Sequence, residues 1–211
     1  DDYISNFSEF DLQSRLGTSE KVSKEDLVEF LARQTVDWTD FEKIKVNKIF
    51  SELNICYAPY KEYLMDSVKL IKTTGREECH AAYTRNKHIY VPISMVQWPY
   101  DELKELIAHE LFHVISTANP KFRNDLYRKL GFTACPELNT PKDYKHLSVS
   151  NPDTIGKNCY VTFQNNGAQT MAVPFLYSET PYSGGYFFEY FQFTFLESEM
   201  KNDRCLPLFE N

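Results

Sequence analysis

Apolar residues recur at helical spacing in four stretches of the chain, each with recognisable start or stop signals. Ser23 is followed three residues later by Asp26, and Thr39 by Glu42, as in capping boxes that begin helices. Pro99 suits a first helical position, and Gly131 is typical of a residue that ends a helix. The pattern therefore predicts helices over residues 23–34, 39–54, 99–118 and 120–130. In the second of these, the residues at helical spacing that form the apolar face are Phe41, Ile44, Ile49, Phe50 and Leu53.

Shorter runs rich in Val, Ile, Thr, Tyr and Phe predict strands, several of them in the last third of the chain. Asn165-Asn166-Gly167 is a good hairpin turn between two of these runs. The layout is α+β, with a helical N-terminal part, a small mixed sheet and a β meander at the C-terminus. We expect one domain over 1–211, its helical and small-sheet part at about 1–130 and its β-rich part at about 131–211. The predicted strands cover residues 67–74, 81–84, 89–91, 145–150, 158–164, 168–176 and 185–196.

Composition excludes some classes of protein but does not indicate a function. The 211 residues carry a net charge of −7, and this acidic balance argues against a dedicated nucleic-acid binder, which needs a basic face. No run of about 18 uncharged apolar residues is present, so we expect no membrane span. We expect no nucleic-acid partner, and we also expect a monomer.

The first residue and the cysteines leave the cellular compartment open. The chain starts at Asp1 rather than Met, which indicates a processed or expressed form, compatible with an exported or cell-envelope protein. Five Cys occur without a CxxC pair. They are either buried free thiols or, in an exported protein, two disulfides and one free thiol.

The sequence His109-Glu110-Leu111-Phe112-His113 carries the strongest chemical signal. Two His four residues apart lie on one face of a helix, about one turn from each other, so both can bind one Zn²⁺. Glu110 follows the first His and is placed to act as the general base that takes a proton from water. A His, His and carboxylate ligand set leaves a coordination position open, which predicts a catalytic rather than a structural site.

Ala81-Ala82-Tyr83-Thr84, shortly before this helix, resembles the edge strand of the zincin metallopeptidases, especially the gluzincins. The resemblance implies a zincin-like fold in which Ala82 and Tyr83 hold an extended substrate by main-chain hydrogen bonds. It also implies a third zinc ligand, a Glu some 20 or more residues after the second His, and Glu137 fits. Pro136 makes a long helix there unfavourable, so we expect Glu137 in a loop or strand. Asp153, in a turn after a predicted strand, is the alternative ligand, or only a residue that shapes that turn.

The span from about 68 to 160 also resembles a group of uncharacterised bacterial proteins described as zinc metalloproteases. The likeness rests on the segments AAYTR at 81–85, HELFH at 109–113, the Asn119-Pro120 region and NPD at 151–153. The group implies peptidase activity but no particular substrate.

Together these patterns predict a zinc metallopeptidase that hydrolyses protein or peptide substrates, with His109, His113 and Glu137 as ligands and Glu110 as base. Two alternatives stay open: a binding protein with a zincin fold and no turnover, and a zinc hydrolase of a non-peptide substrate. A donor to the developing oxyanion is also expected. Tyr160 is the first candidate for it, ahead of His146, Tyr177 and Tyr182.

Overall fold

The computed structural model describes residues 2–140, 145–146, 148–165 and 167–208, and its contacts divide the chain into two compact units. Unit 1 comprises residues 1–27 and 121–211, and unit 2 comprises residues 28–120. Each unit has its own sheet, and the mixture of helices and two sheets confirms the predicted α+β class. The single domain over 1–211 stays a prediction.

Unit 2 holds the small sheet and the longest helices. Helix α3 begins in unit 1 and ends in unit 2, and the predicted hydrogen bonds between Ser23 and Asp26 are present at its start. The elements are α3 (Lys24–Ala32), α4 (Asp40–Tyr57), η1 (Ala58–Tyr63), β1 (Lys69–Thr73), η2 (Arg76–Glu78), β2 (Tyr83–Arg85), β3 (His88–Pro92), α5 (Ile93–Val96) and α6 (Tyr100–Ala118).

Helix α4 confirms its predicted capping box, and its expected apolar face is buried only in part, at Ile49 and Leu53. Thr39 and Glu42 exchange the two hydrogen bonds of the box. Phe41 and Ile44, expected on the apolar face, are 78% and 69% exposed, whereas Glu42 is buried. The reason is a long-range partner, because Lys72 on β1 donates to the Glu42 carboxylate at 2.7 Å.

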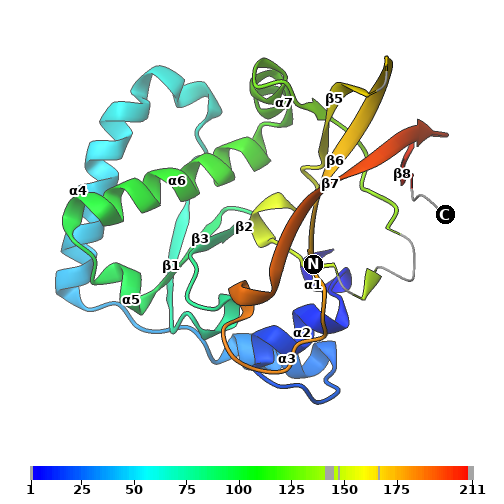
Figure 1. Cartoon of the computed structure of the whole chain (residues 1–211). Helices are drawn as coiled ribbons and strands as arrows, with labels where there is room; N and C mark the ends of the chain where they lie inside the picture. The colour runs from blue at the N-terminus through cyan, green and yellow to red at the C-terminus, as the bar shows by residue number, and fades with distance from the viewer. Residues whose placement is uncertain (1, 141–144, 147, 166, 209–211) are drawn as a thin grey trace. The chain divides into compact units, whose positions relative to one another are not determined.

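The sheet of unit 2 has the strand order β1-β3-β2. β1 runs parallel to β3, and β2 is antiparallel to β3 and lies at the edge. Helix α6 packs against β2, β3 and α4 (Figure 1). This packing buries the apolar side of α6 in a core whose buried members are Ile49, Leu53, Ile89, Val91, Val96, Leu103, Ile107, Leu111 and Val114.

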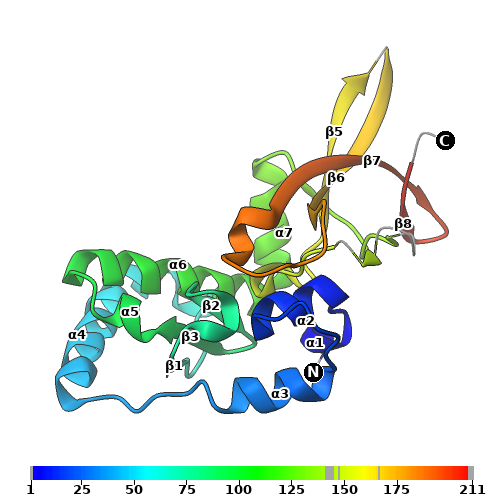
Figure 2. The ribbon, with the colours of Figure 1, turned by 60° about the horizontal axis from the view of Figure 1, so that its bottom comes forward.

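Unit 1 contains the β meander, with strand order β4-β5-β6-β7-β8 and every neighbouring pair antiparallel. β7 bends along its length, and the β5–β6 hairpin extends beyond it (Figure 2). The elements are α1 (Asp2–Ser5), α2 (Glu9–Leu16), α7 (Pro120–Lys129, entered from unit 2), β4 (Thr133–Ala134), η3 (Pro152–Thr154), β5 (Cys159–Asn165), β6 (Ala168–Ser178), η4 (Phe187–Tyr190), β7 (Phe191–Lys201) and β8 (Arg204–Pro207).

Two predicted strands of this unit differ from the structure. In the 145–150 segment, the described residues form only the isolated bridge between Ser148 and Tyr177. The 185–196 segment begins with the 3-10 helix η4, and β7 continues to Lys201. The predicted hairpin is confirmed by the pairing of Asn165 with Ala168, although Asn166 in its turn lies outside the described residues.

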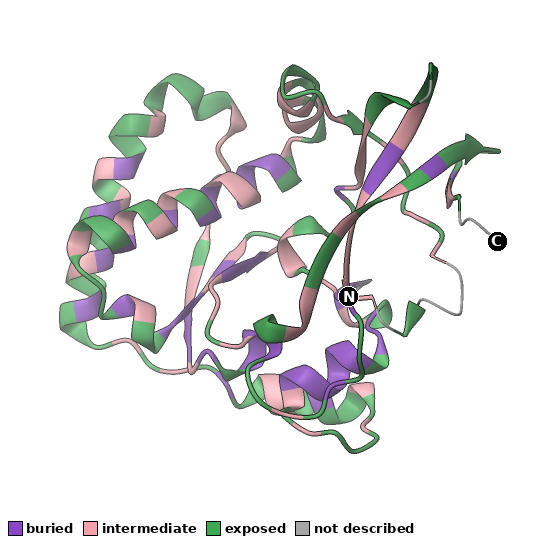
Figure 3. Cartoon of the chain, viewed as in Figure 1, coloured by how far each residue is buried: buried purple, intermediate pink, exposed green. Residues whose placement is uncertain are grey.

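A buried ion pair anchors the N-terminal segment within unit 1. Figure 3 shows α2 buried over most of its length. Arg15 and Asp11, one turn apart on α2, form an ion pair at 2.9 Å with both side chains almost fully buried. Asp11 also accepts from the backbone N–H and hydroxyl of Ser150, and Arg15 donates to the Ser150 carbonyl. These bonds fix the position of Ser150, directly before Asn151.

No helix among the described residues is long and apolar enough to cross a membrane, as expected from the sequence. All five cysteines are free thiols in this structure. Cys205 is buried and Cys56 is exposed, so the expectation that they are buried holds only in part.

Candidate functional site

Helix α6 brings His109 and His113 together, as the spacing predicted. The two Nε2 atoms are 3.0 Å apart, and the imidazole rings meet edge to face with their centroids 4.7 Å apart. Two nitrogens that bind one tetrahedral zinc ion at about 2.0–2.1 Å stand about 3.3 Å from each other. The pair therefore fits a shared zinc ion, with a small outward adjustment of the rings.

Burial differs sharply among the three residues of the motif. Glu110 is 3% exposed, His113 is half-buried and His109 is exposed. The free-energy cost of burying polar groups therefore falls mainly on Glu110 rather than on all three side chains. A buried carboxylate on the same helix as two more exposed imidazoles is suited to act as a base that is shielded from bulk water.

The helix that carries the motif is held in place by hydrogen bonds from its neighbours. Tyr57 at the end of α4 donates to the Ala108 carbonyl at 3.3 Å, directly before His109. Burial raises the pKa of Tyr57, so this hydroxyl stays protonated and can donate. At the other end, the Asn119 side-chain amide bonds both to Ile115 and to Tyr63. These contacts fix α6 within unit 2.

Strand β2 occupies the edge position that the sequence predicted near Ala82 and Tyr83. Ala82 lies one residue ahead of the strand, and Tyr83 is its first residue. The Tyr83 ring is buried and stacks on the Tyr90 ring, with the two ring centroids 4.6 Å apart. The Tyr83 ring therefore belongs to the packing of the sheet. A role of Ala82 and Tyr83 in substrate binding stays a prediction.

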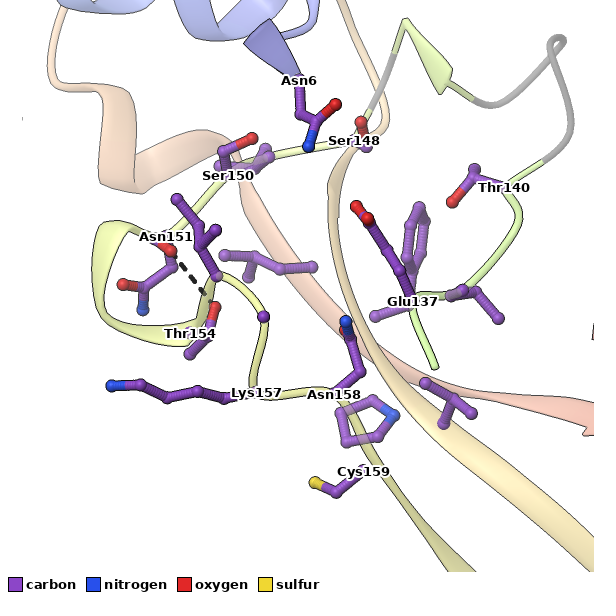
Figure 4. Close-up of a pocket in the computed structure, with 18 of the residues that line it drawn as sticks. Asn6, Glu137, Thr140, Ser148, Ser150, Asn151, Thr154, Lys157, Asn158 and Cys159 are labelled. Carbon is purple, nitrogen blue, oxygen red and sulfur yellow. Dashed lines mark hydrogen bonds between the residues drawn. The ribbon is translucent and has the colours of Figure 1, made fainter. Parts of the chain in front are cut away.

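Glu137 lies in unit 1, outside any helix, as expected beside Pro136. It lines a pocket of about 960 Å³ inside that unit. Glu137 and Thr140 stand on one side of this pocket, with Asn151 and Thr154 on the other (Figure 4). Its apolar lining comes from the sheet and the segments beside it, including Leu138, Val149, Val173, Pro174, Phe175, Leu176, Phe193 and Phe195.

Asp153 also belongs to unit 1, in the short helix η3. Here Asn151 makes the turn, because its side-chain oxygen accepts from the Asp153 backbone N–H at 2.9 Å. Shaping the turn therefore does not require the Asp153 carboxylate. Since His109 and His113 belong to unit 2, the choice of third ligand between Glu137 and Asp153 stays a prediction.

The four candidate donors to the oxyanion differ in their contacts and burial. Tyr182 is buried and donates to the Gly185 carbonyl at 2.8 Å, which gives it a structural role. Tyr177 stacks on Phe175, and Tyr160 pairs with Thr133 between β5 and β4. His146 is exposed in a turn rather than in a strand. None of these contacts tests the predicted role in stabilising an oxyanion.

Sequence reasoning missed the anchor that Asp11 and Arg15 provide for the segment before Asp153. Two local signals were present, since Ser8 and Asp11 form a capping box and Asp11 and Arg15 stand four residues apart. Their partner Ser150 lies 139 residues further along than Asp11, and no local pattern indicates that contact.

No protein-family model, no curated protein and no solved structure matches this chain. The resemblance to zincins therefore rests on the motifs quoted above.

Proposed function

We propose that this protein is a zinc-dependent metallopeptidase with a zincin-like fold that hydrolyses protein or peptide substrates. The observation that carries the proposal is the pair of His109 and His113 Nε2 atoms 3.0 Å apart on α6, with the buried Glu110 between them in sequence. This combination supplies two metal ligands and a base on one rigid element.

His109 and His113 would hold the zinc ion, which when bound supplies a Lewis acid for the scissile carbonyl. Glu110 takes a proton from the attacking water and later delivers it to the leaving amine. The Glu110 carboxylate is buried, so bulk water has little access to it once substrate is bound.

The edge position of β2 supports a peptide substrate over other hydrolysable groups. Within the described residues, β2 pairs with β3 on one side only. An extended peptide can add to its other side through main-chain hydrogen bonds, in the manner of a further strand. The alternatives are a zinc hydrolase of a non-peptide substrate and a binding protein without turnover. The intact Glu110 disfavours the latter.

The zinc site is tested by removing one ligand. We expect His113→Ala to leave the purified protein with far less zinc than wild type, because the variant lacks one of the two imidazole ligands that helix α6 supplies. Elemental analysis after dialysis against micromolar zinc measures the content. His80→Asn is the matched control, since His80 is exposed and Asn tolerates its positive φ of 67°. Wild-type protein that binds no zinc contradicts the proposal.

The third ligand is tested by comparing two isosteric substitutions. We expect Glu137→Gln to weaken zinc binding and Asp153→Asn to leave it unchanged, because an amide is a poorer zinc ligand than a carboxylate. A competition titration with a chromophoric chelator gives both affinities. The reverse ranking assigns the ligand to Asp153, and two unchanged affinities show that neither residue binds zinc.

A further inference from the structure

The pocket of about 960 Å³ in unit 1 has an apolar wall on strands β6 and β7. Phe193 and Phe195 lie two residues apart on β7, so their rings share one face of the sheet, with centroids 5.3 Å apart. Leu176 and Pro174 on β6 are their direct partners and lie on the same face. All four residues line the pocket, so one face of two neighbouring strands forms this wall.

The aromatic rings of this wall are open to solvent. Phe193 is 62% exposed and Phe195 is also exposed. Leu130, directly after α7, adds a third exposed apolar side chain to the lining. A group of exposed apolar side chains around a hollow is typical of a surface that binds a ligand.

Three asparagines supply polar groups to the same pocket: Asn6, Asn139 and Asn158. Figure 4 shows the side chains of Asn6 and Asn158 directed towards the space between them. Within the described part of the chain, none of the three side-chain amides makes a hydrogen bond. Each amide carries two N–H donors and one carbonyl acceptor. The three amides are therefore available to a ligand that can both donate and accept.

Other polar side chains of the lining are hydrogen-bonded within the protein. The Ser150 hydroxyl donates to the Asp11 carboxylate at 2.8 Å, and the Thr154 hydroxyl donates to the Asn151 carbonyl at 3.2 Å. These bonds hold the segment opposite Glu137 in shape (Figure 4). The pocket therefore combines a fixed polar segment with amides that have no partner.

The charged side chains of the lining carry both signs. Glu137 is negative, whereas Lys145, Lys157 and Arg204 are positive. A strongly charged ligand of either sign meets a like charge here. Hydroxyl groups can donate to the carboxylate and accept from the three cations, so a neutral polyhydroxyl ligand suits all four.

We propose that this pocket binds a neutral oligosaccharide. The C–H face of a sugar ring packs on Phe193 and Phe195, since the negative π face of an aromatic ring attracts weakly positive C–H groups. Its hydroxyls bond to the amides of Asn6, Asn139 and Asn158, which donate and accept as hydroxyls do. The volume lies near the upper end of the range of about 300–1,000 Å³ for ligand sites, so the pocket has room for more than one ring. The proposal does not depend on zinc or on peptide hydrolysis.

The test is calorimetric titration of the full chain with neutral trisaccharides of glucose, mannose, galactose and N-acetylglucosamine. We expect at least one of them to bind with a Kd of about 1 mM or lower. Decanoate is the apolar probe without hydroxyls and should bind more weakly. Failure of all four trisaccharides overturns the proposal, as does tighter binding of decanoate.

Variants place the bound sugar in this pocket. Phe193→Ala and Asn6→Ala should each weaken binding about tenfold, because each removes one contact from an exposed position. Phe163→Ala is the matched control, since Phe163 is an exposed ring on β5 of the same sheet and does not line the pocket. Equal losses in Phe193→Ala and Phe163→Ala contradict the assignment.

The same titration with added zinc and with a chelator separates this pocket from the proposed zinc site. We expect the same affinity in both, so the saccharide site and the metallopeptidase can fail independently. Binding that appears only with zinc would move the sugar to the metal and overturn the proposal.

Discussion

Glu110→Gln is expected to retain zinc but to lose peptide hydrolysis by a factor of about 10²–10⁴, the usual contribution of a positioned general base. Gln has nearly the same size and shape as Glu, so the buried site beside His109 and His113 keeps its packing. It cannot take a proton from water, and the loss should therefore appear in kcat rather than in zinc content.

Matched measurements separate this loss from damage to helix α6. Glu105→Gln changes an exposed carboxylate on the same helix and should leave both zinc content and turnover at the wild-type level. Turnover of labelled casein and of a mixed peptide library is followed for each variant, with zinc measured on the same samples. Full activity in Glu110→Gln contradicts the proposed mechanism. Zinc-loaded wild type without turnover favours the binding-protein alternative.

The parts of the fold that local chemistry determines could be predicted from the sequence. Helix α6 begins at Tyr100, after Pro99, and ends before Asn119, as its start and stop signals indicate. The distance between His109 and His113 follows from the helical repeat alone. The capping box of Thr39 and Glu42 is equally local.

What could not be predicted depends on partners far along the chain. Phe41 and Ile44 were expected inside on periodicity, yet the side of α4 that carries Glu42 is buried, because Lys72 and Gln97 satisfy its carboxylate. The same limit applies to the site. The proximity of His109 and His113 follows from one helix, whereas the position of the proposed third ligand depends on a long-range contact that no spacing specifies.

Breaking the buried pair of Glu42 and Lys72 is expected to destabilise unit 2 by about 3–5 kcal/mol, the usual cost of leaving one buried charge without its partner. Lys72→Met removes the ammonium, keeps most of the apolar length and leaves the Glu42 carboxylate buried. Both tryptophans, Trp38 and Trp98, lie in unit 2, so their fluorescence during urea unfolding reports the stability of this unit.

A double-mutant cycle shows whether the loss comes from the pair itself. Glu42→Gln with Lys72→Met should be more stable than Lys72→Met alone, because no buried charge remains. Lys43→Met is the matched control, since its pair with Asp40 lies at the surface of the same helix and should contribute at most about 1 kcal/mol. Equal losses from Lys72→Met and Lys43→Met contradict the assignment.

The same pair predicts an acid-sensitive stability. The hydrogen bond from Lys72 lowers the pKa of Glu42 to about 2 in the folded state, against a reference value of 4.5 for an unfolded chain. Since the folded pKa is depressed, the stabilisation is fully present above pH 4.5 and is lost as the pH falls towards 2. The free energy of unfolding of wild type should therefore decline through this window more steeply than that of Glu42→Gln, in which the group does not titrate. Parallel curves for the two proteins between pH 5 and pH 2.5 would show that Glu42 is not the titrating group that couples folding to acid.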